Sequence, residues 1–300
     1  MLLPQKHNIM SLIIQKYRSR LAEYLELIKF EHTIFALPFA LSGMLLAIPD
    51  GFPKINIFIW VMLAMLGGRT ASMALNRIID ADIDKENFRT ANRAIPSGSI
   101  KKISAFILAL LSFGVLIFAV WHLPLICRQL LPIAIVILAF YSYTKRFTIL
   151  THLILGSALG SASAGGWLAV SGTITLPVVI WGLAIVFWVA GFDIIYAIQD
   201  IEFDKKNKLF SIPAKFGIEI SLFISKIFHI ITVILLIILG KIWGIGYFYW
   251  IGLVFAGFML IYEHSLINKN DLSKINVAFF NINGYVSIGI FLFILLDKVL

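Results

Sequence analysis

The sequence predicts an all-α protein of the polytopic membrane class, a bundle of nine transmembrane helices. Of its 300 residues, 60% are hydrophobic and only 14% are charged, and the mean hydropathy is +0.94. A soluble protein of this length could not cover so much apolar surface with polar groups. The connections between apolar stretches are short, such as PDGFPK (49–54) and SGTITLP (171–177), so neighbouring helices are expected to run antiparallel.

A helix needs about 20 largely apolar residues to cross a bilayer. Because no linker interrupts the chain, residues 1–300 are expected to form one integral-membrane domain. Residues 1–31 carry apolar side chains at helical spacing among basic ones, which predicts an amphipathic helix in the membrane interface. The alternative is a helical tail packed on the bundle. Nine segments are candidate spans: 32–49, 54–80, 102–122, 129–144, 149–171, 176–200, 220–240, 243–263 and 275–297.

The distribution of Lys and Arg predicts the orientation of the bundle. Of the 25 basic residues, four lie on one face and one, Arg69, lies inside a span, which leaves 20 on the face that carries the N-terminus. The positive-inside rule makes that face cytoplasmic. The net charge of +9 is then explained by cationic loops facing an anionic leaflet, and neither nucleic acid nor an obligate protein partner is expected. The four residues of the opposite face are Lys54, Arg128, Lys241 and Lys298.

An acidic motif occurs twice, at the cytoplasmic ends of the second and sixth spans. IIDADIDKEN (78–87) aligns with AIQDIEFDKKN (197–207) at a constant offset of 120 residues. The offset relates Asp80 to Asp200 and Asp84 to Asp204. Such repeats are common in membrane folds built from related halves.

Residues four apart on a helix share a face, whereas residues two apart point away from each other. Asp80 and Asp84 are therefore expected to project together, as are Asp200 and Asp204, while Asp82 points elsewhere. Asn76 lies one turn before Asp80, and Tyr196 takes the corresponding place before Asp200. Four converging carboxylates would repel one another unless cations lay between them. Mg²⁺ accepts such oxygen ligands and bridges them to phosphates, so the pattern predicts a metal–diphosphate site.

Basic residues follow each motif and the fourth span. These are Arg89 and Arg93, Lys145 and Arg146 in YSYTKRFT (141–148), and Lys205, Lys206 and Lys208. Arg and Lys stabilise phosphate oxygens through charge-assisted hydrogen bonds. The alternative is that these are solvated loop ends, and that interpretation is preferred for Lys101, Lys102, Lys206 and Lys269.

Other features leave two interpretations open. Arg69 lies two turns before Asn76, and Asp193 two turns before Asp200, so Arg69 either pairs with Asp193 or recognises a substrate carboxylate or carbonyl. GSALGSASAGG (156–166) predicts close helix packing, and a groove for a lipid chain ranks second. The histidines lack metal-ligand spacing and are interpreted as structural, with His32 nearest the active face.

These motifs resemble those of the UbiA-type intramembrane aromatic prenyltransferases. NRIIDADID (76–84) fits their N-x-x-x-D-x-x-x-D motif and DIEFD (200–204) their second D-x-x-x-D, and the match extends to RTANRAIPSG, YSYTKRFT, DIIYAIQD and SIPAKFG. The resemblance implies Mg²⁺ as cofactor, held with the diphosphate by Asn76, Asp80, Asp84, Asp200 and Asp204. It implies diphosphate binding by Arg89, Arg93 and Lys145, with Tyr141 beside them, and places Arg69 and Asp193 in the pocket. Lys208 departs from the family, which commonly has Gly there.

The resemblance implies transfer of a polyprenyl group from polyprenyl diphosphate to an aromatic acid, in the bacterial cytoplasmic membrane. The acceptor it favours is 4-hydroxybenzoate, for ubiquinone; a dihydroxynaphthoate of the futalosine route to menaquinone is the alternative. Arg146, like Arg69, could bind the carboxylate of either. A cation transporter using the paired aspartates is the competing class, but the acids cluster at one face among cationic loops. A CDP-alcohol phosphotransferase would need a D-G-x-x-A-R signature, which is missing.

Overall fold

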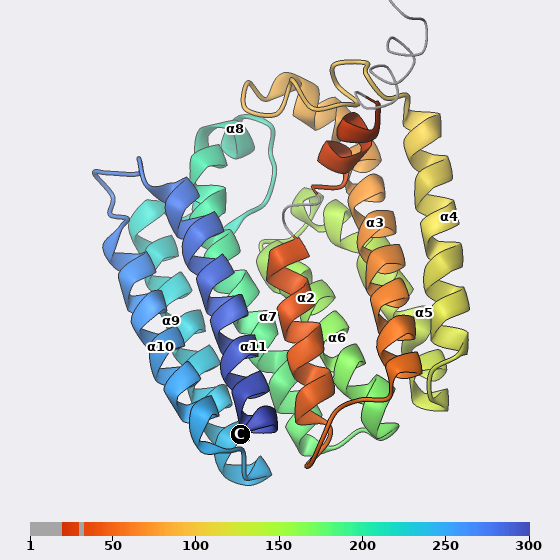
Figure 1. The fold of residues 1–300 in the computed structure, drawn as a ribbon. Coiled ribbons are helices and arrows are strands. Elements are labelled where there is room, and N and C mark those ends of the chain that lie inside the picture. Colours follow the sequence, from red (N-terminus) through yellow and green to blue (C-terminus); the bar gives the residue numbers. More distant parts are fainter. Residues whose placement is uncertain (1–19, 30–32) are drawn as a thin grey trace, which may run out of the picture.

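Helices form the whole framework of the protein in a computed structural model that describes residues 20–29 and 33–300 (Figure 1). The all-α prediction is confirmed, since the described residues contain no strand beyond one isolated bridge, Asn268 to Asp271. After residues 20–27, which are helical, the elements are α2 (Thr33–Leu46), α3 (Ile55–Glu86), α4 (Lys102–Trp121), α5 (Leu125–Phe140), the 3₁₀ helix η2 (Tyr141–Arg146), α6 (Thr151–Ser171), α7 (Leu176–Ala197), the 3₁₀ helix η3 (Ile198–Asp200), α8 (Ile201–Lys206), α9 (Ile212–Trp243), α10 (Tyr247–Ser265), the π-helix η4 (Val277–Ile282) and α11 (Asn283–Val299).

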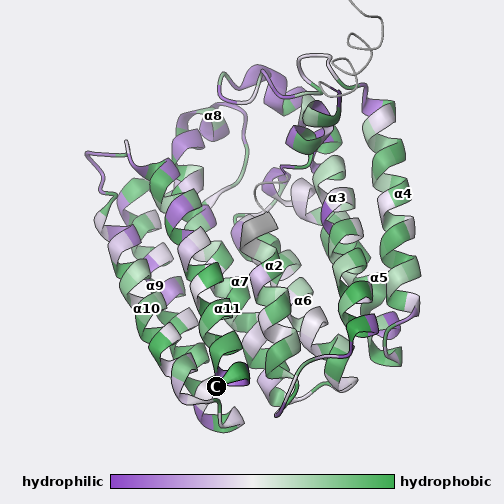
Figure 2. Cartoon of the chain, in the orientation of Figure 1, coloured by the Kyte–Doolittle hydropathy of each residue, from purple (hydrophilic) through white to green (hydrophobic). Residues whose placement is uncertain are grey.

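The described helices are those of an integral membrane protein. Seven helical segments are long and apolar enough to cross a bilayer: α3, α4, α5 with η2, α6, α7 through α8, α9, and η4 with α11. Helix α2 is a shorter apolar helix, and α10 occupies the remaining predicted span. The count of nine spans therefore stays a prediction. Figure 2 shows apolar residues along the bundle and polar residues gathered at the end that carries α8.

Several helix boundaries differ from the predicted spans. Helix α3 continues to Glu86, beyond the predicted end at 80, because the acidic motif itself is helical. Helix α9 begins at Ile212 rather than at 220, and Gly217 kinks it with a φ of 77°. This left-handed conformation is open to glycine without steric cost. The second acidic motif does not continue α7, since the 3₁₀ turn η3 interrupts the α-helical hydrogen bonding before α8.

Residues 20–29 contact the bundle through Tyr24, Leu27 and Ile28, whereas Leu21 and Leu25 are exposed. Leu27 is 2% exposed and lies in an apolar cluster with Ala74 and Ala81 of α3. The Leu27 carbonyl accepts a hydrogen bond from Nε of Arg77 at 3.1 Å. For these residues both the interfacial helix and the packed tail stay predictions. The other residues of the 1–31 prediction lie outside the described residues.

Helix α6 approaches its neighbours through small residues, as its sequence predicts. A Cβ placed on Gly156 would lie 2.3 Å from the Val186 carbonyl oxygen of α7, and one on Gly160 would lie 2.6 Å from the Val186 side chain. On the other side, a Cβ on Gly166 would lie 2.3 Å from the Ala40 carbonyl oxygen of α2. Close backbone approach is what brings helices together in a bilayer, where the hydrophobic effect does not act between them.

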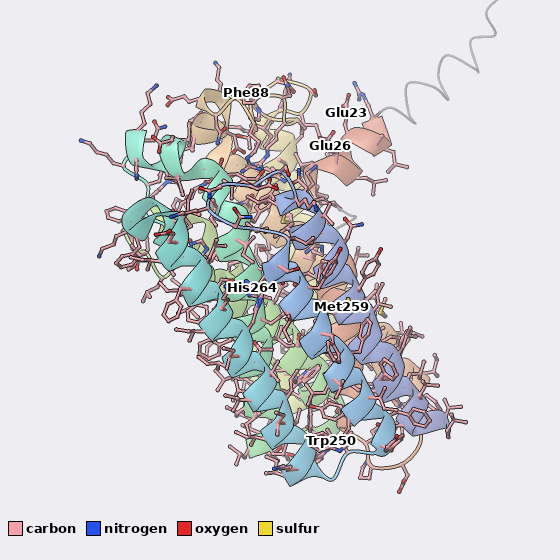
Figure 3. All side chains as sticks on the ribbon, turned by 90° about the vertical axis from the view of Figure 1, so that its left-hand side faces the viewer. Glu23, Glu26, Phe88, Trp250, Met259 and His264 are labelled. Carbon is pink, nitrogen blue, oxygen red and sulfur yellow. The ribbon has the colours of Figure 1, made fainter. Side chains whose placement is uncertain are left out.

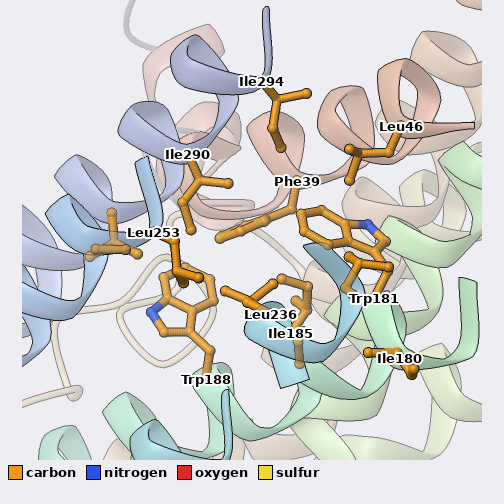
Figure 4. Close-up of a cluster of buried hydrophobic side chains, with 14 of the residues drawn as sticks. Phe39, Leu46, Ile180, Trp181, Ile185, Trp188, Leu236, Leu253, Ile290 and Ile294 are labelled. Carbon is orange, nitrogen blue, oxygen red and sulfur yellow. The ribbon is translucent and has the colours of Figure 1, made fainter. Parts of the chain in front are cut away.

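A cluster of buried hydrophobic side chains, aromatic and aliphatic, joins α2, α7, α9, α10 and α11 (Figure 4). The ring of Phe39 packs between Trp181 and Trp188, with centroid separations of 5.6 and 4.7 Å. At the end opposite α8, the Asp297 carboxylate accepts the backbone N–H groups of Phe248 and Tyr249 at 2.8 and 2.6 Å. It thereby caps the N-terminus of α10, where the helix dipole favours an anion.

A buried polar cluster connects the C-terminal helices and stabilises the π-helix. The Asn283 amide donates to Glu263 Oε1 at 2.8 Å and to the carbonyl groups of Ala278 and Phe279 at 3.0 and 3.3 Å. His229 contacts His264 at 3.0 Å between their ring nitrogens. Figure 3 shows His264 midway along the bundle. Because Asn283 satisfies carbonyl groups of the π-helix, it fixes the segment that carries Phe279 to Ile282.

Candidate active site

The first acidic motif lies near the end of α3, where its carboxylates are covered by cationic loops. Asp80 and Asp84 are 3% and 4% exposed. Asp80 accepts hydrogen bonds from Lys145 Nζ at 2.7 Å and from Arg146 at 3.2 Å, both in η2. The Asn76 amide donates to the same carboxylate at 3.1 Å, across one helical turn. The predicted face of α3 is therefore present, and η2 lies against it.

Asp84 is paired with the loop that follows its own helix. Arg93 donates to both carboxylate oxygens of Asp84 at 2.8 Å, and the Thr90 hydroxyl donates to the Asp84 carbonyl at 3.0 Å. Asp82 points away, as its spacing predicts: its exposed carboxylate pairs with Lys102 at 2.9 Å. The alternating positions of the motif thus separate a buried pair from a solvated residue.

The second acidic motif contacts the loop that follows the first. Asp200 is held by the Arg89 guanidinium, which contacts both carboxylate oxygens, and by the Asn87 amide at 3.0 Å. Arg89 also donates to the Tyr196 hydroxyl at 2.9 Å. Although burial by itself lowers the pKa of Arg89, the hydrogen bond and charge of Asp200 raise it above its ordinary value. Arg89 therefore stays cationic.

Asp204 is tied to the start of α9. The Ser211 hydroxyl donates to Asp204 Oδ2 at 2.9 Å and accepts the N–H of Ala214 at 3.2 Å, as an N-cap does. Lys208, in the connecting loop, has a φ of 54°. This left-handed conformation explains why glycine suits the position where the resemblance places it.

The carboxylate oxygens of the two motifs are suitable Mg²⁺ ligands, but most of the carboxylates lie beside Lys or Arg side chains. In the described part of the chain, no three His, Cys, Asp or Glu side chains converge as ligands of one ion. Three of the four motif acids, Asp80, Asp84 and Asp200, face Lys or Arg instead. Carboxylate oxygens are the ligands that Mg²⁺ prefers beside phosphates. Each Lys or Arg thus lies beside a carboxylate, where a metal ion could bind. Each of these carboxylates lies beside a cation, where a phosphate could bind.

A cavity of about 590 Å³ opens beneath the two motifs between α3, α4, α5, α6 and α7. Its polar lining comprises Arg69, Asn76, Tyr141, Asp193 and Tyr196, among others. The rest is mainly apolar and includes Leu116, Val120, Leu131, Ala158, Ala162 and Gly165. The small residues of α6 therefore agree with both interpretations of their motif, because some pack on α7 and others border the apolar cavity.

Arg69 and Asp193 do not form an ion pair with each other in the described residues. Arg69 donates to the Lys29 carbonyl at 3.0 Å, and Asp193 contacts His152 Nδ1 at 2.7 Å. Their shared place in the cavity lining is compatible with the alternative, recognition of a substrate, which stays a prediction. Arg146 also donates to the carbonyl groups of Ser142 and Ile79, at 2.9 and 2.8 Å, and so fastens η2 to α3.

Polar contacts of the site also involve residues outside the sequence prediction, among them Asn87, Thr90, Ser142, His152 and Ser211. The repeat itself marks Asn87, because Asn207 follows the second motif at the same offset of 120 residues. The sequence interprets His152 as structural, and the structure places it, buried, against Asp193. No local pattern marks His152. His32 lies outside the described residues.

The protein is a membrane-embedded helical bundle in which paired acids and cations close one end of an apolar cavity. This arrangement suits an amphiphile with an anionic head. The chain belongs to the UbiA prenyltransferase family, whose model matches residues 36–285. It is similar to the 4-hydroxybenzoate octaprenyltransferase of Janthinobacterium sp. (strain Marseille), at 31% identity over 84% of this chain and 88% of the relative. The enzyme of that name from Photobacterium profundum is 30% identical over 81% of this chain and 84% of its own.

Solved structures share the fold. The apo structure of a UbiA homolog from Aeropyrum pernix K1 superposes with a TM-score of 0.81 and 34% identity, covering 89% of this chain and 98% of that one. A UbiA homolog from Archaeoglobus fulgidus bound to GPP and Mg²⁺ superposes with a TM-score of 0.72 over 93% of this chain and 100% of its own. Its identity is 19%, so this likeness concerns the fold.

Proposed function

We propose that the protein catalyses Mg²⁺-dependent transfer of a polyprenyl group from polyprenyl diphosphate to 4-hydroxybenzoate, in ubiquinone biosynthesis. The observation that carries this proposal is the interleaving of Asp80, Asp84 and Asp200 with Lys145, Arg93 and Arg89 above an apolar cavity. The cations suit a diphosphate, the carboxylates suit the metal ions that accompany it, and the cavity suits an isoprenoid chain. The names of the curated relatives support the benzoate acceptor.

In this proposal Asp80, Asp84, Asp200 and Asp204 hold Mg²⁺, with Asn76 in support. Bound Mg²⁺ supplies neutralisation of the charge that develops on the leaving diphosphate. Arg89, Arg93 and Lys145 leave their carboxylates and donate to phosphate oxygens, which stabilises the same charge. Arg146 stays partly engaged with backbone carbonyls, so its contribution is to hold η2 and Lys145 over Asp80.

The cavity side chains orient the organic groups. Arg69 binds the acceptor carboxylate, and Asp193 accepts a hydrogen bond from the acceptor hydroxyl. The rings of Tyr141 and Tyr196 border the same cavity, and their π-faces can stabilise a cationic allylic carbon. The allylic C–O bond breaks with its electron pair on diphosphate, a ring carbon beside the hydroxyl bonds to the allylic carbon, and that ring carbon loses its proton.

The setting of the reaction follows the membrane fold. We propose that residues 1–300 form one catalytic domain in the bacterial cytoplasmic membrane, with the N-terminus and the loops of the site on the cytoplasmic face. The excess of Lys and Arg on that face supports this orientation. The isoprenoid chain then stays in the bilayer while its diphosphate enters from the cytoplasmic side.

Purified protein in lipid nanodiscs with Mg²⁺, octaprenyl diphosphate and 4-hydroxybenzoate tests this function. The expected result is a product whose mass equals the acceptor plus the octaprenyl group less one hydrogen. A dihydroxynaphthoate is the competing acceptor, and a product from it alone would overturn the benzoate assignment. Cation flux through proteoliposomes without any prenyl product would favour the transporter alternative instead. Diphosphate release with neither acceptor modified would overturn aromatic prenyl transfer altogether.

A further inference from the structure

His152 lies directly behind a carboxylate of the cavity. It sits in the first turn of α6, is 2% exposed, and takes no part in the cavity lining. Its Nδ1 is 2.7 Å from Oδ2 of Asp193, which does line the cavity. Its Nε2 is 3.3 Å from the backbone nitrogen of Ile212, the first residue of α9. One imidazole therefore contacts α7 and α9 at once.

The hydrogen-bond partners determine which ring nitrogen carries the proton. The Ile212 N–H can only donate, so Nε2 of His152 accepts, and in a neutral ring the proton then resides on Nδ1. Nδ1–H donates to Asp193 Oδ2. Among the described residues, the Asp193 carboxylate makes no other hydrogen bond, so Oδ1 remains for a group in the cavity.

The same imidazole lies between the cavity and the second acidic motif. Ser211, next to Ile212 in the chain, donates its hydroxyl to Asp204 at 2.9 Å. The start of α9 therefore binds both His152 and Asp204. An aligned imidazole can fix the orientation of a neighbouring functional group, as partners of metal ligands do in other proteins. A general packing role would need neither hydrogen bond, because an apolar side chain could fill the same space.

We propose that His152 is a positioning residue that orients Asp193 through Nδ1, so that the free carboxylate oxygen receives the hydroxyl group of the aromatic acceptor. This inference rests on the proposed function. The hydrogen bond from the hydroxyl to Asp193 raises the electron density of the ring carbon beside it, which is the carbon that attacks. Loss of the alignment weakens recognition of the hydroxyl while leaving the carboxylate of the acceptor with Arg69.

Two matched substitutions separate the two hydrogen bonds of His152. The amide of Asn reaches the position of Nδ1 and can donate to Asp193, whereas the amide of Gln reaches the position of Nε2 and can accept from Ile212. We expect H152N to keep the KM for 4-hydroxybenzoate within about threefold of wild type, and H152Q to raise it at least about tenfold. The KM for the prenyl diphosphate is expected to be unchanged in both variants. His122→Gln is the control for replacing a histidine, because His122 is exposed at the C-terminal end of α4 and does not line the cavity.

Binding of benzoate, which lacks the hydroxyl, distinguishes alignment from general damage to the fold. We expect H152Q to weaken 4-hydroxybenzoate binding about tenfold, and to leave benzoate binding and the melting temperature near those of wild type. Equal loss of both ligands in H152Q, or equal KM values in H152N and H152Q, would overturn the positioning role. If wild-type protein binds neither ligand and forms no product, the proposed function fails instead, which is a different result.

Discussion

Arg89 and Asp200 join the two acidic motifs across 111 residues of sequence, with the guanidinium facing both carboxylate oxygens. Arg89 belongs to the loop after the first motif, and Asp200 begins the second. The Asn87 amide reinforces the contact at 3.0 Å. Before any substrate is present, acidic and basic side chains of the site therefore pair with one another. Ligands must replace these partners when they bind.

The buried and exposed acids of the first motif should differ sharply in importance. Asp80→Asn is expected to lower kcat/KM at least about 100-fold, because it removes a carboxylate that contributes to stabilising the leaving diphosphate. Asp82→Asn is the matched control, because Asp82 is exposed and contacts Lys102, and it should retain most activity. Initial rates with radiolabelled acceptor measure both. Near-normal turnover in Asp80→Asn would exclude a role for this carboxylate in metal binding.

Mg²⁺ and inorganic diphosphate should bind together more tightly than either binds alone. Mg²⁺ at Asp84 would leave Arg93 without its partner, and diphosphate at Arg93 would leave Asp84 unpaired, whereas both ligands together satisfy both residues. The coupling is expected to be on the order of 1–3 kcal/mol. Melting temperatures of the purified protein with each ligand and with both measure it.

Arg93→Gln tests the source of that coupling. The substitution removes the cation that diphosphate must recruit, so the combined shift in melting temperature should shrink toward the sum of the separate shifts. Lys102→Gln alters an exposed pair beside the same motif and should leave the coupling intact. Additive shifts in the wild-type protein would contradict the exchange of partners described above.

Close packing of α6 on α7 should be intolerant of even one methyl group. Gly156→Ala would bring a Cβ within 2.3 Å of a carbonyl oxygen of Val186, so the helices must separate. Overpacking of this kind costs about 1–3 kcal/mol. Gly114→Ala in α4, where a Cβ would meet no atom within 4 Å, is the control and should be neutral or stabilising. Unfolding in mixed detergent measures the difference, and equal stability of the two variants would refute the packing argument.

The buried Glu263–Asn283 contact should contribute to stability through the π-helix. Glu263→Ala removes an acceptor of the Asn283 amide and leaves a buried space, so a loss of about 2–4 kcal/mol is expected. Glu263→Gln retains an oxygen for that amide and should lose less. Glu219→Gln alters only an exposed pair with Lys269, which solvent screens, and should leave stability nearly unchanged. Thermal unfolding measures the stability of the three variants. Equal stability of Glu263→Ala and Glu219→Gln would disprove the argument.

Local periodicity describes the first acidic motif, whereas an irregular turn precedes the second. Asn76, Asp80 and Asp84 share one face of α3 because that helix is continuous through Glu86. At the second motif the 3₁₀ turn Ile198–Asp200 lies between Tyr196 and Asp200, so the regular rotation of an α-helix does not apply to that pair, whereas the α-helix Ile201–Lys206 follows Asp200 directly. Sequence spacing predicts a shared face only while the helix is regular.

The sequence by itself determined the membrane class, the repeated acidic motifs and the outward direction of Asp82, because composition and helical spacing are local properties of the chain. Only the tertiary structure decided that Lys145 pairs with Asp80, Arg89 with Asp200 and His152 with Asp193. These partners lie on different helices and loops, and their distance in space depends on how the helices pack. No spacing rule along one segment records such a contact, so it becomes visible only when the bundle is assembled.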